Sequence, residues 1–250
     1  MAAQRSEQGT PPAPASNGRD PQGGPSATAD RRRTAGAGGP VLPPSLRTRL
    51  GAVAVLAALV VGALGVRYAG HDRPGAVDAW WWPAAEGLGP SWRRVALAID
   101  FLGEPLGAAA LVLVAVVGCL WLRRPRAAAL VVVGTGTAVV TTKLLKPLVG
   151  RTIHDGHLAY PSGHTAFLTA FALVLALLLV GRLAPGRAVG LCWVLAAALV
   201  AGGAMGWAQV ALGAHYPTDA LGGWCTALAV VPATAWLVDR AAPAGRRERR

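Results

Sequence analysis

Residues 160–181 read YPSGHTAFLTAFALVLALLLVG, and the pattern of this stretch indicates the fold class. A polar loop, YPSGH, leads into a run from 165 to 181 that carries no charged side chain. That run is close to the ~20 residues that an α-helix needs to cross a hydrocarbon core. Ser162 is a favourable N-cap for a helix that begins after it. The stretch therefore predicts a membrane-spanning helix whose first turn adjoins a polar loop.

Five further runs without charged residues have similar lengths. They lie at 50–66, 105–122, 127–142, 188–214 and 220–238. The whole chain is 53% hydrophobic and only 14% charged, which is too charge-poor for an ordinary soluble domain. We predict an all-α, polytopic membrane protein in which six transmembrane helices form a helical bundle.

The charge of the chain is concentrated at its two ends. The formal net charge is +12, and residues 1–49 and 240–250 contribute +4 each. Basic segments beside apolar spans indicate cytoplasmic topology and contact with anionic membrane lipids, and they give no support to nucleic-acid binding. Residues 1–45 are predicted as a disordered cytoplasmic tail and residues 241–250 as a basic cytoplasmic tail. The six-helix membrane domain is predicted at 46–240, with its core at 100–238.

Basic residues also mark two of the loops between the predicted spans. Arg123, Arg124 and Arg126 follow the second run, and Arg182 and Arg187 follow the fourth. Cytoplasmic loops of membrane proteins are enriched in Lys and Arg. Because the number of spans is even, we expect a multi-pass protein of the cell membrane with both termini in the cytoplasm.

Polar and ionisable side chains gather at the outer ends of the third to sixth predicted spans. Such groups are costly at membrane depth and indicate a functional site. The predicted cluster comprises Lys143, Lys146, Arg151, His154, His157, Ser162, His164, His215 and Asp219.

The PSGH loop has the properties of an anion site. Unpaired backbone N–H groups and the positive dipole end of the helix suit a phosphate, and Gly163 lets the backbone approach it closely. His164 would stand beside the anion, where a proton donor is needed. A single such histidine is also compatible with an interfacial residue satisfied by hydrogen bonds.

His215 and Asp219 lie four residues apart at the start of the sixth span. At this separation a carboxylate can hold one ring nitrogen and leave the other as a nucleophile or base. The pair alone is also compatible with an incidental contact at a helix end. Lys143, Lys146 and Arg151 add positive charge that suits a dianionic group, or else they anchor the helix end by snorkelling.

Together these residues resemble the type 2 phosphatidic acid phosphatase superfamily, over roughly residues 100–238. The family's Pro-Ser-Gly-His element is matched at Pro161–His164, and its His-x3-Asp element at His215 and Asp219. The resemblance implies a membrane lipid phosphatase that hydrolyses a phosphomonoester or diphosphate of a phosphatidate-like or polyprenyl lipid. The predicted topology places the active site on the extracytoplasmic side, and the resemblance implies that the site uses no metal and no other cofactor.

The resemblance also assigns roles to the residues that match. His215 would attack phosphorus to form a phosphohistidine, Asp219 would orient it, and His164 would protonate the leaving alcohol. The phosphoryl oxygens would be held by Lys146, Arg151, Ser162 and Gly163.

Two positions depart from the family pattern. The family has Arg-Pro where this chain has Ile153-His154, and Ser-Arg where it has Ala208-Gln209. Each charge-assisted hydrogen bond that is lost with an arginine is worth about 1.5 to 3 kcal/mol. The alternative is therefore a catalytically impaired lipid-phosphate binding or carrier protein of the same fold.

A vanadate-dependent haloperoxidase, which shares this type of site, is disfavoured because those relatives are generally soluble. The sequence leaves the identity of the lipid and the oligomeric state open.

Overall fold

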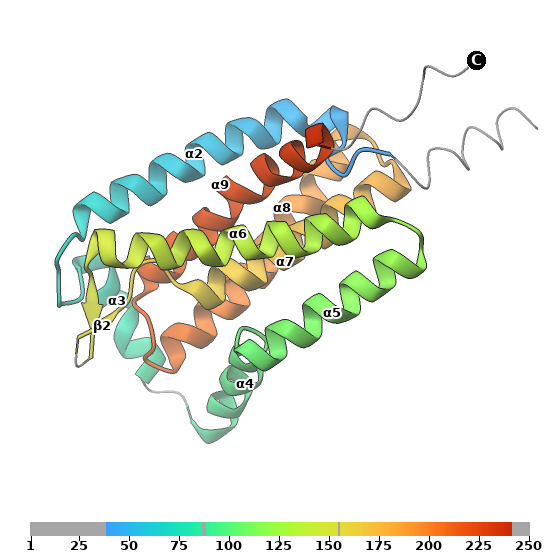
Figure 1. Ribbon diagram of the computed structural model, residues 1–250. Coiled ribbons are helices and arrows are strands. Elements are labelled where there is room, and N and C mark those ends of the chain that lie inside the picture. The colour runs from blue at the N-terminus through green and yellow to red at the C-terminus, as the bar shows by residue number, and fades with distance from the viewer. Residues whose placement is uncertain (1–38, 87–88, 155, 242–250) are drawn as a thin grey trace, which may run out of the picture.

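The computed structural model describes residues 39–86, 89–154 and 156–241. Helices make up nearly all of the regular structure in these ranges, with one short pair of strands (Figure 1). In chain order the elements are η1 (Pro44–Leu46), α2 (Arg47–Arg67), α3 (Ala76–Glu86), α4 (Pro90–Phe101), α5 (Pro105–Trp121), α6 (Pro125–Val149), β1 (Thr152–Ile153), β2 (His157–Leu158), α7 (Gly163–Leu183), α8 (Arg187–Ala211) and α9 (Pro217–Ala241).

Five helices of the described region are long and apolar enough to cross a membrane. They are α2 together with η1, and α6, α7, α8 and α9. The helices α4 and α5 pass the same test only as a pair, and they are bent by 56° at a short break. The prediction of an all-α, polytopic membrane bundle is confirmed, and the bent pair supplies the sixth candidate span.

The bend explains why the second predicted span began at residue 105. Asp100 and Glu104 interrupt the apolar pattern on either side of the break. A window free of charge therefore includes α5 and excludes α4. The helix α5 alone has 17 residues, slightly short of the ~20 needed for a span.

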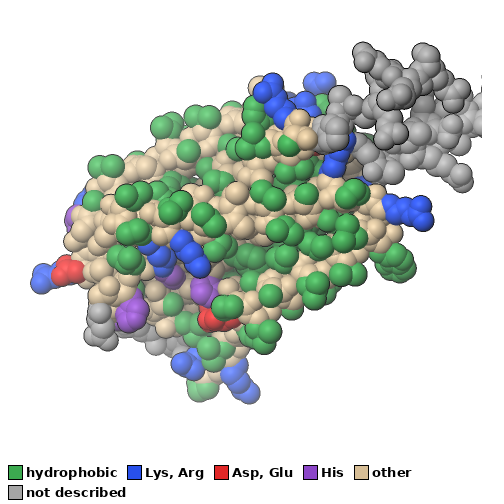
Figure 2. Space-filling model, in the orientation of Figure 1, with side chains coloured by type: hydrophobic (Ala, Val, Ile, Leu, Met, Phe, Trp, Pro, Cys, Tyr) green, Lys and Arg blue, Asp and Glu red, His purple; other side chains and the backbone are tan. Residues whose placement is uncertain are grey.

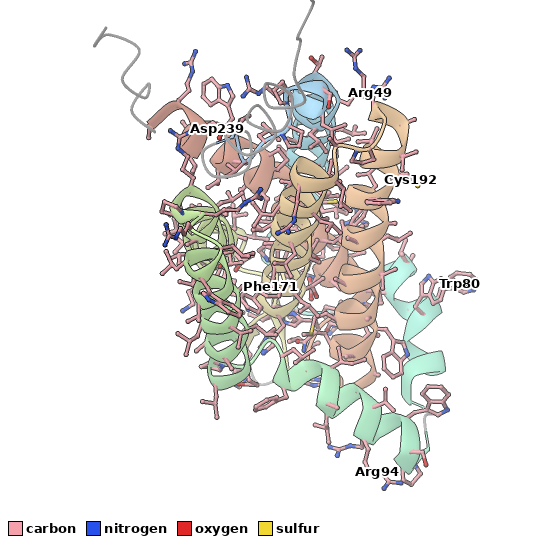
Figure 3. The ribbon with its side chains drawn as sticks, turned by 90° about the vertical axis from the view of Figure 1, so that its right-hand side faces the viewer. Arg49, Trp80, Arg94, Phe171, Cys192 and Asp239 are labelled. Carbon is pink, nitrogen blue, oxygen red and sulfur yellow. The ribbon has the colours of Figure 1, made fainter. Side chains whose placement is uncertain are left out.

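The helix α7 is the centre of the bundle. It packs against α6, α8 and α9, while α2 lies along α9 (Figure 1). Leu173 and Leu177 of α7 are buried in the main apolar core, which also includes Leu130 and Val194. Figure 3 shows Phe171 in the interior of the bundle. Many outward side chains of α2 and α5 are exposed Leu and Val, as expected of surfaces that contact lipid.

The two ends of the described chain meet at one end of the bundle. Asp239, near the end of α9, accepts hydrogen bonds from the backbone N–H groups of Val41 and Leu42, at 2.7 and 3.0 Å. Figure 3 shows Asp239 and Arg49 at this end and Arg94 at the opposite end.

The predicted tails at 1–45 and 241–250 lie largely outside the described residues. Of the first tail, residues 39–45 are described. They include Val41 and Leu42, whose backbone N–H groups donate hydrogen bonds to Asp239. Of the second, only Ala241 is described, as the last residue of α9.

The opposite end of the bundle carries short elements that frame the polar cluster. The helix α6 continues past residue 142 to Val149, so Lys143 and Lys146 lie within it. It ends at Gly150, whose φ of 64° suits a residue without a side chain. The strands β1 and β2 then form an antiparallel hairpin that leads into α7. The region between the first two predicted spans contains α3 and α4.

Candidate active site

The polar cluster lies at the end of the bundle opposite Asp239. Figure 2 shows Lys, His and acidic side chains gathered between α6 and the bend that joins α4 to α5. The helix ends that meet here are those of α6, α7, α8 and α9, as the sequence predicted. The bend between α4 and α5 and the helix α3 also lie at this end of the bundle.

His215 and Asp219 form the buried part of the site. The imidazole Nδ1 lies 3.8 Å from the Asp219 Oδ2, and it has no hydrogen-bond partner among the described residues. Asp219 is fixed in place, since its Oδ2 accepts a hydrogen bond from the Tyr216 N–H at 3.0 Å. Catalytic hydrogen bonds are often long before substrate binds, so this separation suits an orienting role for the carboxylate.

The pKa of His215 lies below its ordinary value of 6.5, chiefly because burial disfavours the charged imidazolium. The positive charges of Lys146 and His164 act in the same direction, while Asp219 opposes them. Burial therefore favours the neutral form of the His215 imidazole. A neutral imidazole has the free lone pair that a nucleophile requires.

Arg151 is fully buried beneath this pair. Its Nη1 donates hydrogen bonds to the Thr218 Oγ1 and the Asp219 Oδ1, each at 2.6 Å, and its Nη2 donates to the Asp78 Oδ2 at 2.6 Å. The guanidinium also lies between two aromatic rings, 4.1 Å from the Tyr68 centroid and 4.5 Å from that of Tyr216. It therefore faces two carboxylates, whereas the sequence analysis placed it against a phosphoryl group.

Asp78 of α3 is a site residue that sequence reasoning missed. Its side chain has no exposed surface, and it bonds both the guanidinium of Arg151 and the start of α9. The Asp78 Oδ1 accepts hydrogen bonds from the backbone N–H and the hydroxyl of Thr218, at 2.9 and 2.8 Å. An acid inside the apolar, aromatic segment AVDAWWW was the only local signal of this role.

The PSGH loop is held against α9 by close backbone packing. Ser162 caps α7, since its Oγ accepts from the Thr165 N–H at 3.4 Å and from the Thr165 hydroxyl at 3.0 Å. Its own N–H donates to the carbonyl of Asp219 at 3.0 Å, so the two motifs are bonded directly. A Cβ added at Gly223 would overlap the carbonyl of Ser162. Gly163, by contrast, has ordinary space around it, with the Thr142 Oγ1 3.5 Å from the place of a Cβ.

His164 stands beside the bend between α4 and α5. Its Nε2 lies 3.5 Å from the Glu104 Oε1 and 3.8 Å from the Asp100 Oδ1. A Cβ added at Gly103 would overlap the His164 ring, so the bend and the ring are in close contact. The sequence analysis did not place either acid at the site, because no local pattern ties them to a residue some 60 positions away.

Lys146 reaches the hairpin from α6. Its Nζ donates to the carbonyl of Leu158 at 2.6 Å, and an ammonium group can donate two further hydrogen bonds. Lys143 is exposed on the same helix. His154 lies 3.0 Å from the carbonyl of Gly213 through its Nε2.

The side chains that stand in place of the two arginines of the family pattern, Ile153 and Gln209, both contact other parts of the protein. Ile153 is buried in a small apolar cluster with Ala159 and Tyr216. The Gln209 amide donates a hydrogen bond to the Asp100 carboxylate, at the bend that contacts His164.

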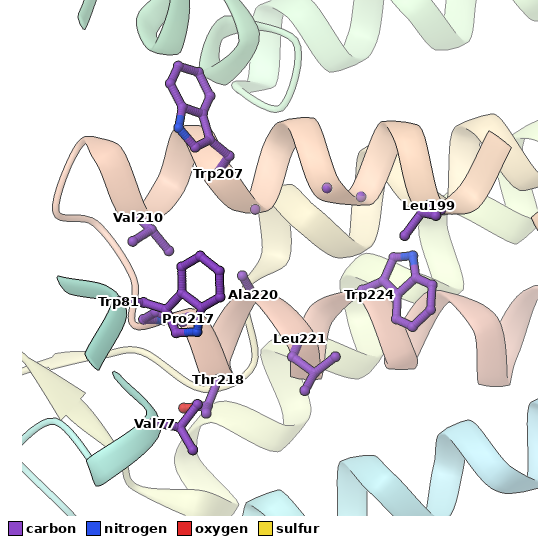
Figure 4. A pocket seen from close by; sticks show the side chains of 13 residues that line it. Val77, Trp81, Leu199, Trp207, Val210, Pro217, Thr218, Ala220, Leu221 and Trp224 are labelled. Atoms are coloured by element: carbon purple, nitrogen blue, oxygen red, sulfur yellow. The ribbon is translucent and has the colours of Figure 1, made fainter. Parts of the chain in front are cut away.

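An apolar groove of about 640 Å³ adjoins the start of α9 (Figure 4). Trp81 of α3 lies beside Pro217 at one part of it, and Trp224 lies beside Leu199 further along. Thr218 also lines the groove, so one wall of the groove is shared with the network around Arg151.

Comparison with known proteins extends this description. The chain resembles the crystal structure of a transmembrane PAP2-type phosphatidylglycerolphosphate phosphatase from Bacillus subtilis, with a TM-score of 0.61 and 24% sequence identity over 78% of this chain and 98% of that one. A search of curated proteins finds no match. Residues 127–243, which contain the Pro-Ser-Gly-His loop and the His-x3-Asp pair, match the family model of the PAP2 superfamily. Residues 127–243 of the chain therefore belong to the PAP2 superfamily.

Proposed function

We propose that the protein is a membrane-bound lipid phosphatase that works through a phosphohistidine. The observation that carries this proposal is the buried imidazole of His215, whose Nδ1 lies 3.8 Å from the Asp219 carboxylate, within electrostatic reach of His164 and Lys146. Membership of a phosphatase superfamily supports the same class of reaction.

The residues divide the reaction between two imidazoles. His215 attacks phosphorus, so a P–N bond forms as the P–O bond to the lipid alcohol breaks. His164 stands where it can give the proton that the departing oxygen needs. In the second step water attacks phosphorus, the P–N bond breaks, and inorganic phosphate leaves.

Positive and hydrogen-bonding groups hold the phosphoryl oxygens in this proposal. Lys146 contributes charge, and Ser162 and Gly163 contribute the N-terminal end of α7. Arg151 takes a different part from the expected one. Because its guanidinium is bonded to Asp78 and Asp219, it positions the carboxylate that orients His215.

A lipid substrate is supported by the surroundings of the site. Leu144 and Leu148 flank Lys146 on α6 and are 63% and 78% exposed, and Phe101 and Leu106 are 50% and 73% exposed at the bend. Apolar side chains exposed on both sides of a polar site suit a headgroup that stays attached to an apolar chain. Phosphatidate-like and polyprenyl phosphates or diphosphates both fit this description.

The proposed orientation places the site outside the cytoplasm. The loops between α5 and α6 and between α7 and α8 carry Arg and lie at the end of the bundle away from the cluster. A reporter fused after residue 250 is expected to be active in the cytoplasm. Activity of the same fusion only outside the cytoplasm would reverse the orientation.

The test is phosphate release by the purified protein in detergent. The panel contains phosphatidate, phosphatidylglycerol phosphate, and polyprenyl mono- and diphosphates, each with wild type and His215→Ala. We expect release from at least one lipid and its loss in the variant. No release from any lipid, under conditions where an active PAP2 phosphatase turns over, would contradict the proposal.

The second candidate is a lipid-phosphate binding or carrier protein. It is favoured by Ile153 and Gln209 at the two arginine positions and by the acids beside His164. Tight binding of a lipid phosphate without hydrolysis, unchanged by His215→Ala, would support it.

A further inference from the structure

The two ring nitrogens of His164 have different surroundings. The Nε2 is buried and has no hydrogen-bond partner among the described residues, although the side chain as a whole is 29% exposed. A Cβ added at Gly103 would overlap the Cδ2 atom of the ring, which is bonded to Nε2. The Cδ2–Nε2 edge of the imidazole therefore packs against the bend between α4 and α5. The edge that carries Nδ1 faces away from Gly103.

Two carboxylates stand next to the buried nitrogen. The His164 Nε2 lies 3.5 Å from the Glu104 Oε1 and 3.8 Å from the Asp100 Oδ1. These separations are longer than hydrogen bonds, but contacts in an active site often tighten only when substrate binds. An ionised carboxylate accepts hydrogen bonds and cannot donate them. Both acids therefore favour a proton on Nε2.

Gln209 leaves the charge of Asp100 available to the histidine. The Gln209 amide donates a hydrogen bond to the Asp100 Oδ1 and carries no charge of its own. The family pattern has an arginine at this position, and a guanidinium here would neutralise the carboxylate. In this chain the amide holds Asp100 in place, and its negative charge acts on His164.

We infer that Asp100 and Glu104 are positioning residues that keep a proton on Nε2 of His164, so that Nδ1 is the atom that protonates the departing oxygen. The inference rests on the proposed function and names how the acid of that mechanism is oriented. A carboxylate beside one ring nitrogen fixes the tautomer and the direction of the other. His215 and Asp219 show the same relation with the nitrogens exchanged, since there the carboxylate stands next to Nδ1.

The proton can be followed through both steps of the reaction. Before the first step the His164 ring carries a proton on each nitrogen. As the P–O bond breaks, the Nδ1 proton passes to the lipid oxygen, and the neutral ring keeps its Nε2 proton beside the carboxylates. In the second step Nδ1 takes a proton from the water that attacks phosphorus. The P–N bond to His215 breaks at the same time, and both rings are restored.

The first test identifies the protonated nitrogen. The full-length protein is labelled with ¹⁵N-histidine and studied in detergent micelles by nuclear magnetic resonance. It has five histidines, and the ring signals absent from His164→Ala belong to His164. At a pH where this ring is neutral, we expect its proton on Nε2.

The acid variants show what holds that proton. Glu104→Gln and Asp100→Asn should each move the two ring signals of His164 toward those of a mixture of tautomers. Asp72→Asn, which neutralises an exposed loop acid, is the matched control and should leave them unchanged. A proton on Nδ1 in the wild type, or unchanged signals in both acid variants, would overturn the inference.

The second test compares a poor leaving group with a good one. The alcohol of octyl phosphate needs a proton to depart, whereas the phenolate of p-nitrophenyl phosphate departs without one. General acid catalysis contributes roughly 10² to 10⁴ in rate, so the loss of kcat/KM in Glu104→Gln should be about tenfold or more greater on octyl phosphate. The Glu104 side chain makes no capping hydrogen bond to α5, so its substitution leaves the fold intact. Equal losses on both substrates would indicate a merely structural role and would overturn the inference.

The proposed function fails separately. A protein with the His164 proton on Nε2 that releases no phosphate contradicts only the phosphatase. A protein that releases phosphate with the His164 proton on Nδ1 contradicts only the part assigned to Asp100 and Glu104.

Discussion

His215 and Arg151 share the carboxylate of Asp219, one at each oxygen. The Oδ1 accepts from the guanidinium at 2.6 Å, and the Oδ2 lies 3.8 Å from the imidazole. The sequence predicted the His-Asp pair because four residues at the start of one helix bring both side chains together. It did not predict the part of Asp78, which is 140 positions away from Thr218 along the chain. A contact between residues so far apart in the sequence depends on where α3 packs, and no local sequence pattern predicts it.

The buried imidazole predicts how activity depends on pH. Because burial lowers the pKa of His215 below 6.5, the neutral nucleophile persists to lower pH than a free histidine would. The acidic limb of kcat/KM should therefore have its midpoint below pH 6.5. Stability should behave in the same direction, since the contribution of the neutral imidazole is complete above pH 6.5 and is lost as the pH falls through its lowered pKa. A pH profile of lipid phosphate release checks this, and an acidic midpoint above pH 6.5 would contradict it.

The ion pair between Asp78 and Arg151 predicts a large loss of stability on substitution. Asp78→Asn leaves a buried guanidinium with one carboxylate fewer, and breaking such a pair typically costs about 3 to 5 kcal/mol. Thermal unfolding in detergent, followed by circular dichroism, should show a clearly lower midpoint. Asp72→Asn is the control and should unfold as wild type does. Equal midpoints for the two variants would show that α3 does not anchor the site.

Two helix ends of the bundle are held together by backbone contact. The PSGH loop before α7 bonds the start of α9, and glycines in α9 make the approach possible. The sequence predicted the N-cap at Ser162 from its residue type. It gave no reason to single out Gly223 among 32 glycines, because the need for a glycine arises only when a second backbone lies against it.

The contact predicts that Gly223→Ala separates the two motifs. The new methyl group would overlap the Ser162 carbonyl, which as part of the backbone cannot rotate away. Displacing one imidazole from the other by about 1 Å can cost on the order of 100-fold in rate, and we expect a loss of phosphate release of at least about tenfold. Gly136→Ala in α6 has no neighbour within 4 Å of its new Cβ and should retain activity. Wild-type turnover by Gly223→Ala would show that this contact does not align the two motifs.

At the scale of the whole molecule, the bundle gathers at one end groups that are far apart in the chain. Runs without charged residues predicted five spans directly, because an uncharged apolar run of that length is typical of a transmembrane helix. The sixth was predicted only in part, since Asp100 and Glu104 break the run where α4 meets α5. The same two acids are the part of the candidate site that the sequence did not reveal. Their relation to His164 depends on a 56° bend that composition does not encode.

In the proposed mechanism, the whole fold serves to present the imidazole of His215 as the nucleophile. The most direct measurement is rapid acid-free quenching of the protein with a ³²P-labelled lipid phosphate, followed by detection of labelled protein. We expect label that is stable to base and labile to acid, absent in His215→Ala and retained in His157→Ala, whose exposed ring lies on β2. Rapid phosphate release without any labelled protein, or label that survives in His215→Ala, would contradict the claim.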